Sequence, residues 1–205
     1  MTVVAEARRT AARTRTDVLV LAAAALVVRL PAYFAQRHLH PDDGVYGMSV
    51  VAMRDGGVPY REVFSSQGPL HLPLLYLGDL IGLRTFNAPR VMPVLSGVAI
   101  TLLTYFIGRR IATRTGALLA AAAVAMSGTV LWVTGPITSD GPTLAFVLGA
   151  LLAALRYRES PSSGRAVVVA LLLAGALLVK PAIGLLAGIA PIWLVVRERR
   201  SRDIA

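Results

Sequence analysis

The sequence contains no cysteine, few aromatic residues and few charges. Without cysteine, disulfides and thiolate metal sites are excluded. Only 6% of the 205 residues are aromatic and 16% are charged, whereas 56% are hydrophobic. The net charge of +10 comes from short basic clusters between apolar runs, in a chain with few aromatic residues. This pattern is typical of loops at a membrane face and argues against a nucleic-acid partner.

Long runs of Ala, Leu and Val carry no charge. The run at residues 116–135 has 20 residues, which as a helix cover about 30 Å, the hydrocarbon thickness of a bilayer. The sequence therefore predicts an integral membrane protein.

The run at 18–35 follows a basic N-terminus, as in a signal peptide, but its length and its poor cleavage site favour a retained first span. The apolar runs lie at 18–35, 70–83, 91–107, 116–135, 141–155, 166–179 and 182–196.

Four basic clusters predict the topology of these runs, because Lys and Arg accumulate in cytoplasmic loops. The clusters lie at residues 8–15, 109–114, 156–165 and 197–202. The number of crossings between two cytoplasmic clusters must be even, which predicts external turns at 139–140 and 180–181. Residues 1–17 then form a cytoplasmic N-terminus, and residues 18–205 form one membrane domain in the cell (plasma) membrane.

Three apolar runs lie between the basic clusters at 8–15 and 109–114, but the rule requires an even number of crossings. The run at 70–83 is the one least suited to cross. Its 14 residues reach only about 21 Å, and Asp79 interrupts them, so we expect an interfacial or half-inserted helix on the outer side. The predicted fold class is all-α integral membrane, with about six transmembrane helices and interfacial helices in a large first external loop at residues 36–90. Six of the eleven acidic residues are then expected at the outer side: Asp42, Asp43, Asp55, Glu62, Asp79 and Asp140.

Asp42 and Asp43 open the densest cluster of ionisable groups. Apolar residues at helical spacing follow them, and an aspartate at the start of a helix satisfies free backbone N–H groups. We expect this capping role for at least one of the two. The alternative is a carboxylate at the lip of a cavity, acting as general base towards an acceptor hydroxyl. Tyr46, one helical turn after Asp42, is interpreted as a membrane-interface aromatic, with contact to the acceptor as the alternative.

Three more charged residues lie at the expected outer boundary. Asp140 begins a span and is either a helix cap or a site residue. Lys180 ends another span, and Arg29 lies inside the first one. Either cation could simply extend its charge towards water, but charges at a membrane boundary are also functional candidates. For Arg29 the functional alternative is an anion site.

A divalent metal site in the segment HLHPDD is the weaker hypothesis. Imidazole and carboxylate are suitable ligands, but the segment is short, contains a proline and lacks helix-borne spacing. A metal is therefore unsupported, and no ligands are assigned among the candidates His38, His40, Asp42 and Asp43.

The order of these features resembles the N-terminal half of the GT-C glycosyltransferases, of the type of the protein O-mannosyltransferases and the lipid A aminoarabinose transferase. The motifs, from about residue 17 to 200, are a first span ending in Arg-Leu, then DDGVY, QGPLHLPLLYL, GRRIATRTGALLA, SDGPTLAF and LLVKPAIGLL. The resemblance implies a polyprenyl-phosphate-linked sugar as donor and inverting transfer on the outer side of the membrane. It implies no cofactor besides this donor, and no P-loop is present.

The resemblance also assigns roles. Asp42 matches the essential first acid of the family, the base or acceptor-orienting group, and Asp43 replaces a glutamate. Asp140 matches the acid of a later external loop, and Lys180 matches a lysine that glycine usually follows, whereas proline follows it here.

One departure concerns the donor phosphate. Relatives in the aminoarabinose branch carry a Glu-Lys before the Pro-Leu segment, where this chain has Ser66 and Gln67. Lys180, Arg61 or Arg29 would then have to supply the phosphate contact.

The chain is shorter than most members of that family. We therefore expect a fragment, a truncated reading frame or one part of a split enzyme that needs a second chain. The alternative function is a non-catalytic membrane module, either a lipid-carrier-binding assembly partner or a small transporter. A transporter would pair its charges across a midplane site and show repeats, whereas here the charges gather at one face.

Overall fold

The computed structural model describes the backbone of residues 2–35 and 40–203, and the side chains of residues 11–35 and 40–198. Over these residues the chain forms helices and no strand, with one isolated bridge between Pro59 and Val63. The all-α prediction is confirmed. The elements are α1 (Thr2–Val27), α2 (Leu30–Tyr33), α3 (Pro41–Arg54), α4 (His71–Ile81), η1 (Ala88–Arg90), α5 (Val91–Ile111), α6 (Arg114–Met126), α7 (Gly128–Thr134), α8 (Asp140–Glu159), α9 (Ser163–Val179) and α10 (Pro181–Asp203).

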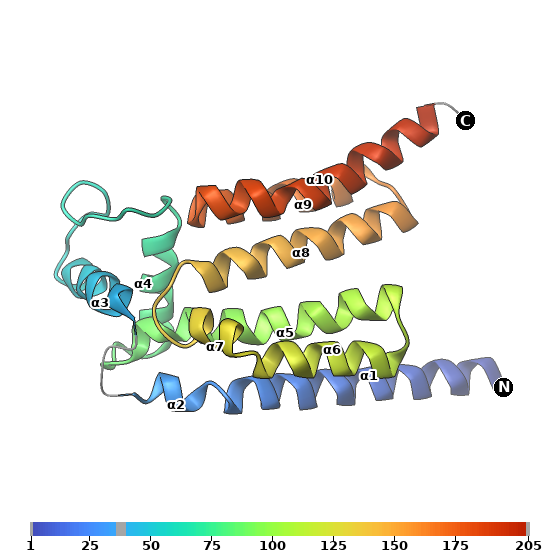
Figure 1. Ribbon diagram of the computed structural model, residues 1–205, viewed down its shortest axis with the longest axis horizontal. Coiled ribbons are helices and arrows are strands. Elements are labelled where there is room, and N and C mark those ends of the chain that lie inside the picture. Colours follow the sequence, from blue (N-terminus) through green and yellow to red (C-terminus); the bar gives the residue numbers. More distant parts are fainter. Residues whose placement is uncertain (1, 36–39, 204–205) are drawn as a thin grey trace.

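The long helices lie side by side along the molecule, and α3 and α4 gather at one end (Figure 1). There α4 runs across the bundle rather than along it. Both termini lie at the opposite end, together with the α5–α6 and α8–α9 connections that carry two of the basic clusters. The clusters therefore share one end of the bundle, as the even-crossing rule requires.

Three helical stretches in the described chain are long and apolar enough to cross a membrane. They are Ala11–Tyr33, Ala88–Ile111 and Pro181–Glu198, and a fourth is added if the bent pair α6 and α7 counts as one span. Helix α9 is apolar but shorter. The structure is thus that of a helical membrane protein with three or four candidate spans, and the expected count of six is not confirmed.

The run at 116–135 forms two helices instead of one. α6 ends at Met126, α7 begins at Gly128, and the two axes differ by 59°. Ser127 between them has an extended backbone, with φ −61° and ψ 124°. Serine competes for backbone hydrogen bonds and glycine weakens a helix, so a Ser-Gly pair is a common place for a kink. The bend is followed by a fully buried connection, residues 135–139, which ends where α8 begins at Asp140.

Helices α3 and α4 are joined by an ion pair whose carboxylate is buried. The carboxylate of Asp79 in α4 is fully buried and accepts two hydrogen bonds from the guanidinium of Arg54, which ends α3. The bidentate geometry fixes the angle between the two helices. Asp79 was expected as one of the acids at the outer boundary, and in the structure it joins two helices at the α3–α4 end.

Candidate functional site

Asp140 and Lys180 form an ion pair at the α3–α4 end of the bundle. Asp140 begins α8 and Lys180 directly follows α9, so the turn predicted at 180–181 is present. The ammonium group donates to Asp140 Oδ1 at 2.7 Å, and the two side chains are 27% and 29% exposed. Two predicted site residues, 40 positions apart, are thus in contact and partly open to a ligand.

The segment at residues 66–70 is hydrogen-bonded to the residue before α8 and to the last residues of α9. Gln67 Oε1 accepts a hydrogen bond from Ser139 Oγ at 3.1 Å. The N–H of Gly68 donates to the carbonyl of Val179 at 3.0 Å, and the N–H of Leu70 donates to the carbonyl of Leu178 at 2.8 Å. A Cβ atom on Gly68 would lie 2.3 Å from the Leu178 carbonyl oxygen, so only glycine permits this approach. The segment therefore lies beside both Asp140 and Lys180.

His71 follows this segment and is completely buried. Its ring packs edge-to-face on Tyr46, with 4.6 Å between the ring centroids. Burial lowers the pKa of His71 to about 4; the positive charge of Lys180 adds to this effect, and Asp140 opposes it. The imidazole is therefore neutral at physiological pH.

Tyr46 does not lie at an exposed interface. It is 2% exposed, and its hydroxyl is 3.0 Å from Ser66 Oγ. Its interpretation as a membrane-interface aromatic is wrong at the level of the single chain, because the ring is enclosed by α3, α4 and the 66–70 segment. Through Ser66 and His71 it is instead connected to the region of the Asp140–Lys180 pair.

The adjacent acids Asp42 and Asp43 have different surroundings. Asp43 is 4% exposed, and its carboxylate accepts from Arg90 at 3.1 Å and from the Ile137 N–H at 2.6 Å. It also accepts from the backbone N–H of His40, the residue that caps α3. The capping role expected for at least one of the two acids is therefore confirmed for Asp43.

Asp42 keeps a partly free carboxylate at the start of α3. Its side chain is 33% exposed and lies 3.6 Å from His40 Nδ1. That nitrogen accepts a hydrogen bond from the Asp42 N–H at 3.2 Å. The structure brings Asp43, but not the carboxylate of Asp42, into contact with the loop that precedes Asp140.

Arg29 and Arg61 lie in opposite environments. Arg29 is fully buried and donates to Thr134 Oγ1 at 2.9 Å and to the Ala25 carbonyl at 2.7 Å. Its guanidinium therefore does not extend to solvent, and its Nη2 has no partner among the described residues. Arg61 is exposed on the 58–63 turn. Neither residue contacts the Asp140–Lys180 pair.

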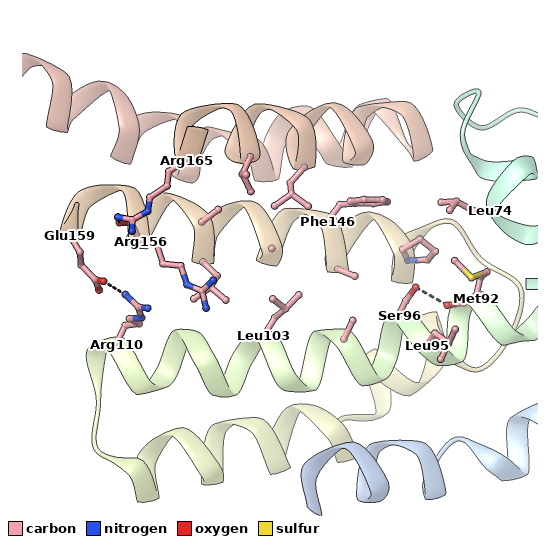
Figure 2. Close-up of a pocket in the computed structure, with 18 residues that line it drawn as sticks. Leu74, Met92, Leu95, Ser96, Leu103, Arg110, Phe146, Arg156, Glu159 and Arg165 are labelled. Carbon is pink, nitrogen blue, oxygen red and sulfur yellow. Dashed lines mark hydrogen bonds and ion pairs between the residues drawn. The ribbon is translucent and has the colours of Figure 1, made fainter. Parts of the chain in front are cut away.

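An elongated cavity of about 870 Å³ lies between α5 and α8 and is flanked by α9 (Figure 2). Its α4 end includes Leu74, one turn after His71, and Pro142, two residues after Asp140. The middle is apolar, with Leu103 and Phe146 among its lining residues. The far end is charged, as Figure 2 shows for Arg110, Arg156, Glu159 and Arg165. A long apolar chain fits the shape and lining of this cavity.

Comparison with known protein families gives one decisive match. The family described as dolichyl-phosphate-mannose-protein mannosyltransferase matches residues 66–205. The chain belongs to this family. Comparisons with curated proteins and with solved structures gave no match. Membership indicates a membrane glycosyltransferase that uses a lipid-linked sugar donor, in agreement with the expected GT-C resemblance.

The region matched by the family includes some of the predicted site residues and excludes others. Asp140 and Lys180 lie inside the matched region, as do Gln67 and His71, whereas the acids of α3 lie before it. Within the described residues no group of three or more His, Asp or Glu side chains could hold a metal ion. His38, a candidate ligand in the sequence, lies outside the described residues.

Sequence reasoning missed two residues that the structure places in contact with predicted site residues, His71 with Tyr46 and Arg90 with Asp43. His71 is the one polar residue between Leu70 and Leu77 apart from Tyr76, and this position in an apolar run was a usable signal. Arg90 carried no such signal, because its role depends on the distant Asp43.

Proposed function

We propose that this chain transfers a sugar from a polyprenyl-phosphate donor to an acceptor hydroxyl, with inversion, at the outer face of the membrane. The observation that carries the proposal is the Asp140–Lys180 ion pair within the region matched by the family, with Asp140 two residues before the cavity-lining Pro142. A donor of this class has an apolar tail and an anionic head. The apolar middle of the cavity suits the tail, and Lys180, paired with Asp140, suits the phosphate.

The chemistry requires one base and one stabilised leaving group. The acceptor oxygen forms a bond to the anomeric carbon of the sugar, and the bond between that carbon and the phosphate oxygen breaks. The acceptor proton passes to a carboxylate, for which we propose Asp42, the more exposed acid of α3. The phosphate leaves with an additional negative charge, which Lys180 stabilises.

Asp43 holds this arrangement in place in our proposal. Its carboxylate joins α3 to Arg90 and to the loop before Asp140, so it fixes the start of α3 relative to the ion pair. Tyr46 has a similar positioning role through Ser66. Arg29 and Arg61, neither of which contacts the pair, remain proposed secondary contacts for anionic parts of the substrates.

The proposed topology follows from the same arrangement. The six elongated segments α1, α5, α6–α7, α8, α9 and α10 cross the plasma membrane, with both termini in the cytoplasm. Helices α3 and α4 lie in the outer interface. Helix α9, with 17 residues, would span only about 26 Å, so the membrane beside the cavity would be locally thin.

Binding of polyprenyl phosphate to the purified chain, measured by native mass spectrometry, tests this function. Lys180→Ala should weaken binding by removing the cation, and Ala153→Phe should weaken it by filling the cavity. Ala120→Phe is the matched control, because Ala120 is exposed on α6 and does not line the cavity. Equal binding of polyprenyl phosphate and zwitterionic phospholipid by all four proteins would refute the proposed donor site.

A further inference from the structure

His71 is buried in a way that packing alone does not explain. Among the described residues, its two ring nitrogens and Arg29 Nη2 are the buried side-chain polar atoms that lack a partner. A neutral imidazole has one donor and one acceptor, and leaving both unpaired in the interior is unfavourable. Phenylalanine could make the same ring contact with Tyr46 without this cost. The two ring nitrogens of His71 are therefore open to a hydrogen-bond partner from outside the chain, either a ligand or a water molecule.

The surroundings of His71 indicate which kind of partner. The 66–70 segment, which immediately precedes it, is bonded to Ser139 next to Asp140 and to Val179 next to Lys180. Both charges of the pair act on the imidazole, consistent with this proximity. The pair itself is close to neutral, and Asp140 occupies one of the three donor protons of Lys180. An anionic group bound there needs further hydrogen-bond donors.

We propose that His71 is a binding residue for the phosphate group of the ligand, donating a hydrogen bond from its neutral imidazole to a phosphate oxygen beside Lys180. This inference rests on the proposed function and adds a residue to its donor site. Access requires the 66–70 segment to shift. One side-chain and two backbone hydrogen bonds hold this segment to α8 and α9, and Ser66 within it is exposed.

Nuclear magnetic resonance of the full chain with ¹⁵N-labelled histidine provides a direct test. The sequence has three histidines, and the spectrum of His71→Gln identifies the His71 signals. Polyprenyl phosphate should shift the ring nitrogens of His71 while leaving those of His40 in place, and polyprenol without phosphate should not. Inorganic phosphate should cause the same shift only at much higher concentration if the lipid-linked group is the source. An unchanged His71 signal at saturating polyprenyl phosphate would overturn the proposal.

Variants separate a binding role from a structural one. His71→Phe should melt at a higher temperature than the wild type, because unpaired polar atoms are removed, and should bind polyprenyl phosphate about tenfold more weakly. His71→Gln, which keeps a donor and an acceptor, should retain more of the affinity. Wild-type affinity in His71→Phe would refute the role of His71 and leave the proposed function intact. If the wild type does not bind polyprenyl phosphate, both proposals fail together.

Discussion

At the scale of single residues, the neighbouring carboxylates of Asp42 and Asp43 illustrate how environment separates two identical side chains. Asp43 is enclosed and bonded to Arg90 and to the Ile137 N–H, whereas Asp42 is one-third exposed. The sequence is compatible with a helix-capping role for one of these acids and a general-base role for the other. It could not tell which acid is the cap, because the partners of Asp43 lie 47 and 94 residues away.

Asparagine substitutions at these two positions should have opposite effects. Asp42→Asn should abolish sugar transfer at an unchanged melting temperature, because the base is lost and no buried contact is broken. Asp43→Asn should lower the free energy of unfolding by about 3 kcal/mol, because buried Arg90 loses its carboxylate. Thermal unfolding and a transfer assay on both variants provide the measurements. Normal turnover by Asp42→Asn would exclude the proposed base.

The buried imidazole of His71 should make stability depend on pH. The pKa of His71 is about 4 in the folded protein and about 6.5 in an unfolded chain. Between these values the unfolded state binds a proton that the folded state does not. Stability should therefore fall as the pH decreases from 6.5 to 4, by up to about 3 kcal/mol from this residue.

Melting temperatures of the wild type and of His71→Phe at pH 7 and pH 4.5 isolate this contribution, since other titrating groups are common to both proteins. The wild type should lose more stability than the variant. An equal loss in the two proteins would contradict a neutral buried His71.

At the scale of elements, local sequence signals located the apolar runs and the start of α8 and α10, but not the irregular connections. Proline and charge located the turn between α9 and α10, and Asp79 together with shortness separated α4 from the spans. The division of 116–135 into α6 and α7 was missed, because a Ser-Gly pair is compatible with a continuous helix unless tertiary packing selects the bend. The 66–70 segment was noted only for lacking a Glu-Lys. Its attachment to α9 depends on a backbone approach that the sequence alone does not reveal.

Substitution of Gly68 tests the importance of this attachment. Gly68→Ala places a methyl group 2.3 Å from the Leu178 carbonyl oxygen, so the segment must move away from α9. We expect a loss of about 1–3 kcal/mol in stability and weaker binding of polyprenyl phosphate. Gly128→Ala is the matched control, because no heavy atom lies within 4 Å of a Cβ at that position, and it should be neutral or slightly stabilising. Identical melting and binding in the two variants would show that the attachment is unimportant.

At the scale of the whole molecule, the acids predicted on the outer side and two of the basic clusters lie at opposite ends of the bundle. The six acids predicted on the outer side lie in α3, in α4, in the turn between them and at the start of α8, whereas two basic connections and both termini lie at the opposite end (Figure 1). Composition and charge clusters predicted the all-helical class and this polarity. They did not establish the number of spans, because kinks and short helices such as α9 decide which segments can cross.

Accessibility of introduced cysteines tests the proposed orientation, because an introduced cysteine is the only thiol in this sequence. Ser66 and Thr113 are both exposed and lie at opposite ends of the bundle. In intact cells an impermeant thiol reagent should label Ser66→Cys and leave Thr113→Cys unlabelled until the membrane is permeabilised. The reverse pattern would invert the proposed topology.

The most direct test of the central claim uses the single lysine of the sequence, Lys180. An amine reagent applied to the purified protein modifies only Lys180 and the N-terminal amine, which peptide mass spectrometry distinguishes. If Lys180 binds the donor phosphate, polyprenyl phosphate should protect it from modification in a concentration-dependent manner, and polyprenol without phosphate should not. Equal modification of Lys180 with and without polyprenyl phosphate would contradict a donor site at the Asp140–Lys180 pair.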